Sequence, residues 1–144
     1  MGTGGAPENV YRVQVHSSVT AIPNYTFAGL FKLEEVDLPE GLEAIGEGAF
    51  FGCPSLKYIN FPSSVRRIGC QAFSSSMTSD AGKFTRLRIP PLVSSIPNRG
   101  FSNSKCIFSL ELPEDLSKIE EYAFSDCHAL RNVALPASAK VEHS

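Results

Sequence analysis

The chain has 144 residues, of which 42% are apolar and 19% are charged, and its formal net charge is −2. This length suits one domain with a continuous core, and the composition is typical of a folded protein rather than a disordered one. A nucleic-acid or anionic-membrane surface would need a basic excess, so neither is expected. No run of the sequence reaches the roughly 18 apolar residues of a membrane helix, so membrane insertion is not expected either.

Residues 1–10 are interpreted as a flexible leader. They begin MGTGGAP, which has neither the basic nor the apolar region of a secretory signal. Without such a signal, and with cysteines that suggest reduced thiols, a cytoplasmic or nuclear location is expected. A cell-surface location remains open if the chain is a fragment.

The main signal is an internal repeat of 23 residues. The phenylalanines that mark it are Phe27, Phe50, Phe73, Phe101 and Phe124, and the prolines are Pro39, Pro62, Pro90, Pro113 and Pro136. Each series contains one step of 28 residues, from Phe73 to Phe101 and from Pro62 to Pro90. A single insertion of five residues explains both steps. It is assigned to residues 74–83, the only stretch of loop composition in that interval.

Within a unit, the pattern predicts a short strand followed by a turn. Ile59 and Phe61 share one parity and are expected to point inward, whereas Tyr58 and Asn60 are expected to point outward. Proline ends the strand because it has no N–H to donate. A second apolar pair, a glycine and an Ala-Phe pair follow. The recurring phenylalanines are predicted to stack as one internal column.

The units share the pattern I/L-P-x-x-V/L-x-x-I-G-x-x-A-F-x-x-C-x-x-L-x-x-V/I over about residues 13–136. This pattern resembles the BspA-like leucine-rich repeat family. Pro23 and Pro97 stand where the pattern has glycine, and Ser104 stands where it has cysteine. The resemblance implies a solenoid fold and a role as a protein-interaction scaffold.

A 23-residue unit cannot bury its apolar face alone, so the units must stack. We therefore expect one leucine-rich-repeat solenoid over residues 11–144, with short parallel strands and an irregular or second-strand outer side. It would have about five and a half coils of 23 residues, the last repeat (133–144) being incomplete. No polar capping unit is visible, so end-to-end self-association through the C-terminal coil is left open.

The four cysteines form no C-x-x-C pair, which disfavours a zinc site. Cys53 and Cys127 occupy the cysteine position of the repeat and are expected to be buried and inert, while Cys70 is expected to be more exposed. No cofactor or metal is expected.

No set of residues predicts catalysis, so an enzyme is not expected. None of the histidines has an acidic neighbour, independent of the repeat pattern, that suggests the orienting residue of a triad. The enzyme hypothesis would be reconsidered if His16 shared a pocket with a carboxylate.

The outward strand positions form the candidate partner-binding face. It consists of Arg12, Gln14, Glu35, Asp37, Tyr58, Asn60, Arg86, Arg88, Ser109 and Glu111. Tyr and Arg often anchor protein interfaces, so a non-catalytic module that binds a protein of unknown identity is the favoured function. A solvated sheet with cross-strand ion pairs would look the same. The alternatives left open are binding through residues 74–83 and a structural or cell-surface adhesive segment of a longer protein.

Overall fold

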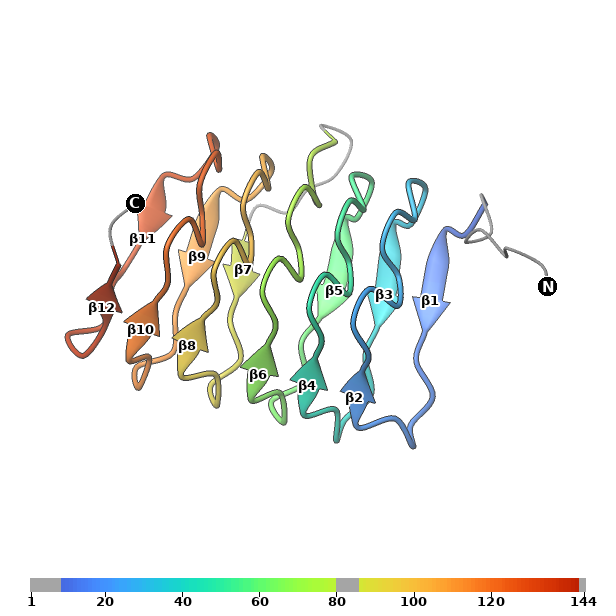
Figure 1. Ribbon diagram of the computed structural model, residues 1–144, viewed down its shortest axis with the longest axis horizontal. Helices are drawn as coiled ribbons and strands as arrows, with labels where there is room; N and C mark the ends of the chain where they lie inside the picture. The colour runs from blue at the N-terminus through green and yellow to red at the C-terminus, as the bar shows by residue number, and fades with distance from the viewer. Residues whose placement is uncertain (1–8, 80–85, 143–144) are drawn as a thin grey trace.

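The computed structural model describes residues 9–79 and 86–142. Residues 1–8 of the expected leader and 80–83 of the expected insertion lie outside this part. The described chain winds as a solenoid with two short strands in each coil (Figure 1). The odd-numbered strands are β1 (Arg12–Gln14), β3 (Glu35–Asp37), β5 (Tyr58–Asn60), β7 (Arg86–Arg88), β9 (Ser109–Glu111) and β11 (Asn132–Val133). The even-numbered strands are β2 (Ala21–Ile22), β4 (Ala44–Ile45), β6 (Arg67–Ile68), β8 (Ser95–Ile96), β10 (Lys118–Ile119) and β12 (Lys140–Val141).

The odd-numbered strands line one side of the solenoid and the even-numbered strands line the other (Figure 1). All pairings are parallel, and residues one repeat apart lie side by side, as Val36 does with Ile59. The expected leucine-rich-repeat solenoid with a second strand in each coil is therefore confirmed. Pro62 follows β5, so a proline does end the strand.

Stacked phenylalanines form the expected column through the core. Phe27, Phe50, Phe73, Phe101 and Phe124 lie with successive ring centroids between 5.2 and 5.6 Å apart. Their planes are within 22° of parallel, and the three central rings are fully buried. Most of the buried side chains around them are apolar, so burial of these rings is a main source of stability.

The turns between even-numbered and odd-numbered strands bond to one another from coil to coil. Phe50 N–H donates to Ala72 O at 2.8 Å, and Phe73 N–H donates to Gly100 O at 2.8 Å. These turns need left-handed backbone, and Gly48, with φ of 57°, provides it. A Cβ at Gly48 would overlap the ring of Tyr25, so glycine serves here for both conformation and space.

Beside the phenylalanine column, a buried or partly buried side-chain donor joins one coil to a phenylalanine carbonyl of the coil before it. The four bonds are Cys53 Sγ to Phe27 O at 3.2 Å, Ser76 Oγ to Phe50 O at 2.5 Å, Ser104 Oγ to Phe73 O at 3.1 Å and Cys127 Sγ to Phe101 O at 3.2 Å. Ser76 thus occupies the cysteine position of the repeat. The five extra residues consequently lie between Ser76 and Arg86, a range that begins later than residue 74.

Both rows of strands are interrupted at the same coil boundary. The sheets are β1-β3-β5 and β7-β9-β11 on one side, and β2-β4-β6 and β8-β10-β12 on the other. Among the strands of residues 9–79 and 86–142, no ladder joins β5 to β7 or β6 to β8, whereas the Phe73 and Phe101 rings stay stacked at 5.2 Å. The solenoid is therefore continuous along its turns and broken along both strand faces.

The C-terminal coil exposes apolar side chains that correspond to buried ones in earlier coils. Val133 pairs in register with the buried Leu110, and Val141 with the buried Ile119, yet both are exposed. Self-association through this coil stays a prediction.

Candidate functional site

The outward residues of the odd-numbered strands form one surface, called here the odd-strand face. Arg12, Glu35 and Tyr58 lie side by side across β1, β3 and β5, and Gln14, Asp37 and Asn60 form the row beside them. Arg86 and Ser109 are neighbours, as are Arg88 and Glu111, across β7 and β9. The structure thus places all ten expected residues on one side of the solenoid, in two groups separated by the break.

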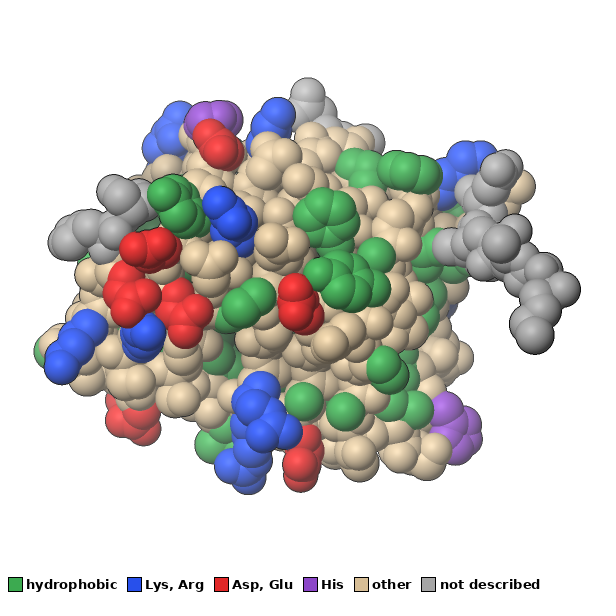
Figure 2. All heavy atoms as spheres, viewed as in Figure 1, with side chains coloured by type: hydrophobic (Ala, Val, Ile, Leu, Met, Phe, Trp, Pro, Cys, Tyr) green, Lys and Arg blue, Asp and Glu red, His purple; other side chains and the backbone are tan. Residues whose placement is uncertain are grey.

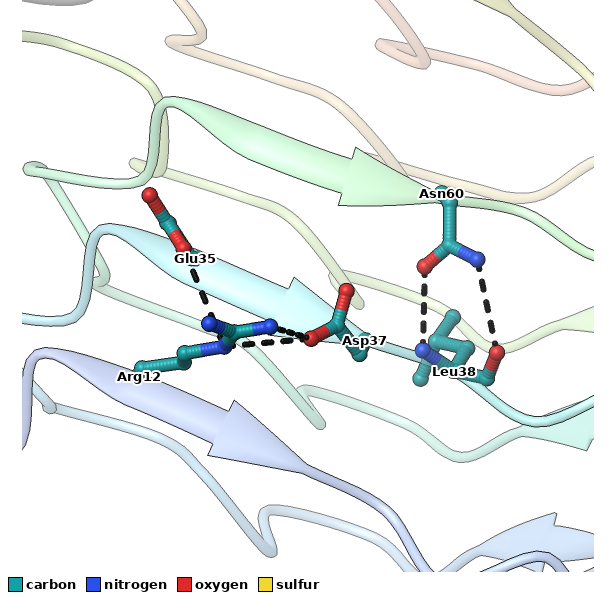
Figure 3. A network of polar contacts seen from close by, with 5 residues as sticks. All are labelled: Arg12, Glu35, Asp37, Leu38 and Asn60. Carbon is teal, nitrogen blue, oxygen red and sulfur yellow. Dashed lines mark hydrogen bonds and ion pairs between the residues drawn. The ribbon is translucent and has the colours of Figure 1, made fainter.

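The first group is acidic and internally paired. Arg12 Nη2 lies 2.6 Å from Asp37 Oδ2, and Arg12 Nε lies 3.8 Å from Glu35 Oε2 (Figure 3). The hydrogen bond from Arg12 to Asp37, followed by the attraction of both carboxylates, raises the pKa of Arg12. One arginine against two carboxylates leaves a net negative charge on this group.

Asn60 has a structural role that the repeat pattern did not reveal. Its Oδ1 accepts a hydrogen bond from Leu38 N–H at 3.0 Å, and its Nδ2 donates to Leu38 O at 3.4 Å (Figure 3). The side-chain amide therefore bonds the backbone of the neighbouring coil just beyond β3. An asparagine at the end of a strand, two residues before a proline, is the only sequence signal for this role.

The second group is basic and shares one carboxylate. Glu111 forms ion pairs with Arg86 and with Arg88, and Arg88 Nε lies 2.6 Å from Glu111 Oε2. Two arginines against one carboxylate leave a net positive charge. The Arg88 side chain remains 76% exposed, so it can still reach a partner.

Tyr58 and Arg88 flank the break between the two groups. Tyr58 is 52% exposed at the edge of β5, and Arg88 lies on β7, the strand across the break. The odd-strand face therefore runs from a negative group, through an exposed aromatic ring, to a positive group. The ion pairs within each group would also form on a solvated sheet that binds no partner. They do not account for Tyr58, an exposed residue of a type that often anchors protein interfaces.

His16 does share a groove with carboxylates. Its side chain lines a groove of about 570 Å³ together with Asp37 and Glu40. However, His16 Nδ1 accepts the Ser18 N–H at 3.1 Å and lies 2.8 Å from Ser18 Oγ, and Asp37 is paired with Arg12. The imidazole therefore caps its own turn.

An equivalent groove between the ends of β7 and β9 has no histidine. It encloses about 420 Å³ and is lined by Arg88, Glu111 and Asp115 among others. Grooves of this kind thus arise from the coil geometry rather than from a catalytic site. Among residues 9–79 and 86–142, no three His, Cys, Asp or Glu side chains are grouped so as to hold a metal ion.

Cys53 is buried as expected, whereas Cys127, which was also expected to be buried, is only partly buried. Burial raises the pKa of Cys53 and of Cys127 to about 11. The thiolate is the reactive form, so the raised pKa disfavours reaction of both near neutral pH. Cys70 is exposed.

The profile of one protein family matches almost the whole chain. Its description is "BspA type Leucine rich repeat region (6 copies)", and it covers residues 7–80 and 79–143. No curated protein sequence matches the chain closely enough to count as a relative. Within the described residues, no helix has both the length and the apolar character needed to cross a membrane.

Solved structures of leucine-rich repeat proteins are similar to this chain. A leucine-rich cell surface protein of Faecalibacterium prausnitzii A2-165 is 26% identical with a TM-score of 0.77, over 93% of this chain and 32% of that one. A Bacteroides ovatus leucine-rich repeat protein is 26% identical with a TM-score of 0.65, over 89% of this chain and 38% of that one. A T. pallidum leucine-rich repeat protein, 20% identical with a TM-score of 0.72 over 92% of this chain and 73% of that one, shows the shared fold alone. The chain thus spans about a third of the length of the first two.

Proposed function

Because this chain belongs to the BspA-type leucine-rich repeat family, we propose that it is a non-catalytic module that binds a protein through the odd-strand face. Leucine-rich repeats present an extended surface on a rigid stack of coils, which suits binding rather than catalysis. The partner would be a protein, since the chain has no basic excess for nucleic acid.

The observation that carries this proposal is the arrangement around Tyr58. An aromatic ring that is 52% exposed stands between a group with net negative charge and a group with net positive charge. Aromatic and arginine side chains anchor protein interfaces, while surrounding charges orient the partner and speed its approach. A partner with the opposite order of charges would fit this face.

A cell-surface adhesive segment is the second candidate function. The similar Faecalibacterium prausnitzii structure is described as a leucine-rich cell surface protein, and this chain covers only 32% of it. A chain of this kind would be one stretch of a longer array. A cell-surface location accords with this relative better than the expected cytoplasmic or nuclear one, for which the comparisons give no support.

Affinity capture from a lysate of the source cells, with mass spectrometry of the captured proteins, tests the first candidate. The face variant is Tyr58→Ala/Arg88→Glu. The matched control is Phe31→Ala/Lys105→Glu, which removes one exposed aromatic ring and reverses one exposed positive charge in the turns. Circular dichroism melting confirms that each variant folds.

We expect one protein to be captured by the wild type and the control but lost by the face variant. Loss in the control alone would assign binding to the turns, next to the expected insertion. Equal capture by all three would reject the odd-strand face. Capture of nothing by the wild type, with attachment of chain-coated beads to whole cells, would favour the adhesive segment.

A further inference from the structure

The outward charges of the odd-strand face follow an order that becomes its own opposite when the face is turned around. β3 carries two carboxylates, Glu35 and Asp37, and β7 carries two arginines, Arg86 and Arg88. Beyond them, β1 carries one positive charge and β9 one negative charge, while β5 in the middle carries none. From β1 to β9 the formal charges of the strands are therefore +1, −2, 0, +2 and −1.

A two-fold axis through β5, perpendicular to the face, would bring opposite charges together. Rotation about this axis reverses the order of the strands and the direction of each strand, so β3 of one copy lies over β7 of the other. An interface of this kind is self-complementary, because each contact occurs twice. The outward pairs that it creates between two copies are Glu35 with Arg88, Asp37 with Arg86, Arg12 with Glu111, Gln14 with Ser109 and Tyr58 with Asn60. Each charged residue thus meets the opposite charge.

The spacing of the coils suits this rotation. The ring of Phe73, in the coil of β5, lies 5.2 Å from Phe50 in the coil before it and 5.2 Å from Phe101 in the coil after it. The next steps, to Phe27 and to Phe124, are 5.3 and 5.6 Å. Along the core the coils are thus evenly spaced on either side of β5, and the long arginine side chains of β7 accommodate the interrupted ladder beside it.

Each charged group keeps an unbalanced charge that a second copy would neutralise. Within one chain, Arg12 pairs with two carboxylates, and Glu111 pairs with two arginines. The side chains of Arg86 and Arg88 are 66% and 76% exposed, and that of Glu35 is 51% exposed. This exposure leaves room for a charge of the partner beside each existing ion pair.

The opposite side of the molecule does not have this symmetry. Figure 2 shows that side, which carries the even-numbered strands and the turns. A group of acidic side chains lies near its C-terminal end, and apolar side chains lie nearer its N-terminal end (Figure 2). Turning this side around would place acidic side chains on apolar ones, so the charge pattern distinguishes the odd-strand face.

We propose that two copies of this chain associate through their odd-strand faces about this two-fold axis. The inference rests on the proposed function, because it uses the same face, and it identifies the protein partner as a second copy. Five strands of three residues, about 4.8 Å apart, cover roughly 20 by 10 Å, well below the about 800 Å² per partner of a standard interface. Charge rather than buried area therefore holds the two copies together, and the dimer is weak and sensitive to salt.

Sedimentation velocity of the full chain, at concentrations from about 10 to about 500 µM, measures the association. In about 20 mM salt we expect a concentration-dependent equilibrium between monomer and dimer. In about 500 mM salt the dissociation constant should rise at least about tenfold, because exposed charges are then screened. A monomer at every concentration in low salt would overturn the proposal. So would species that grow beyond the dimer, because a two-fold interface is closed.

Two charge reversals test the pairing between β3 and β7. The acidic variant, Arg86→Glu/Arg88→Glu, makes both strands negative, and the basic variant, Glu35→Lys/Asp37→Lys, makes both positive. Each variant alone should therefore dimerise at least about tenfold more weakly than the wild type. An equimolar mixture of the two should form a heterodimer, since every contact between β3 and β7 again joins opposite charges. Circular dichroism melting confirms that each variant folds.

The matched control is Arg66→Glu/Arg67→Glu, which makes the same total change of charge as the acidic variant but lies at β6, on the even-strand side. It should dimerise like the wild type, and it should form clearly less heterodimer with the basic variant than the acidic variant does. Equal heterodimer formation by the control and the acidic variant would show that net charge alone drives association, and would overturn the proposal. Wild-type dimerisation of both face variants would overturn it too.

Failure of this inference and failure of the proposed function have different signatures. A monomeric chain that captures a foreign protein, and loses it in the Tyr58→Ala/Arg88→Glu variant, would reject self-association and leave the proposed function standing. A dimer that the mixture restores, with no foreign protein captured, would support the second copy as the partner.

Discussion

The hydroxyl of Ser104 donates a hydrogen bond to the backbone carbonyl of Phe73, across 3.1 Å and one coil boundary. One coil later the thiol of Cys127 makes the same bond to Phe101 O at 3.2 Å. Serine and cysteine are therefore equivalent at this position, because each brings a small donor into a buried site beside the phenylalanine column.

Ser104 can accordingly be exchanged for cysteine but not for alanine. Phe73 O also accepts Ser76 N–H at 3.2 Å, so Ser104→Ala removes one of its two bonds and should cost about 1 kcal/mol. Ser104→Cys keeps a donor in place and should cost clearly less. Urea unfolding of the two variants measures the difference. Equal stability of both variants would show that the bond contributes nothing.

Phe73→Ala should lower the free energy of unfolding by roughly 3–5 kcal/mol, since it leaves a cavity in the middle of the column. Phe31, which is 71% exposed, provides the control, and Phe31→Ala should change stability by no more than about 0.5 kcal/mol. Thermal or urea unfolding gives both values. A similar small loss at both positions would mean that the column is not a main source of stability.

Gly48 and Tyr25 should be energetically coupled. Gly48→Ala introduces a Cβ that overlaps the Tyr25 ring at a φ of 57°, and should cost about 1–2 kcal/mol. In a Tyr25→Ala background the overlap is gone and only the backbone cost remains. The double-mutant cycle should therefore show a coupling of at least about 0.5 kcal/mol. Strict additivity would contradict the packing of the ring over the glycine.

The buried thiols should make the protein less stable in alkali. Burial raises the pKa of Cys53 and Cys127 from the ordinary value of 9.0 to about 11. The unfolded chain therefore loses these protons first as pH rises. Below pH 9, each of these protonated thiols makes its full contribution to the free energy of unfolding. Between pH 9 and pH 11 that contribution falls by roughly 2–3 kcal/mol for each thiol.

Unfolding as a function of pH, compared between the wild type and Cys53→Ser/Cys127→Ser, isolates this effect from other groups. The serine variant should show the shallower decline over that interval. Maleimide labelling near neutral pH should modify the exposed Cys70 quickly and the two buried thiols slowly. Parallel pH profiles, or fast labelling of Cys53, would contradict the burial of these side chains.

Much of the fold follows from the spacing of the sequence. A constant step of 23 residues puts equivalent residues in register, so the phenylalanine column and the outward positions such as Tyr58 could be predicted. The equivalence of Ser76 with Cys53 was hidden, because the donor changes from thiol to hydroxyl just before the insertion. The spacing does place Ser76 after Phe73 as Cys53 follows Phe50, but only the bond to Phe50 O shows that the serine hydroxyl replaces the thiol as donor.

The break between coils was harder to predict, although one sign of it was visible. Pro97 was recognised as a departure from glycine, but its effect depends on the direction of the backbone bonds, which only the structure shows. The pairing of Arg12 with both Glu35 and Asp37 is similarly a matter of side-chain conformation. The function of the ten face residues stays a prediction.

Hydroxyl-radical footprinting of the chain with its captured partner tests the odd-strand face most directly. Tyr58 and Tyr25 are 52% and 49% exposed, so in the free protein their rings should oxidise at similar rates. In the complex, oxidation of Tyr58 should fall strongly while that of Tyr25, on the turn side, stays unchanged. Protection of Tyr25 with no change at Tyr58 would place the partner elsewhere and contradict the proposed function.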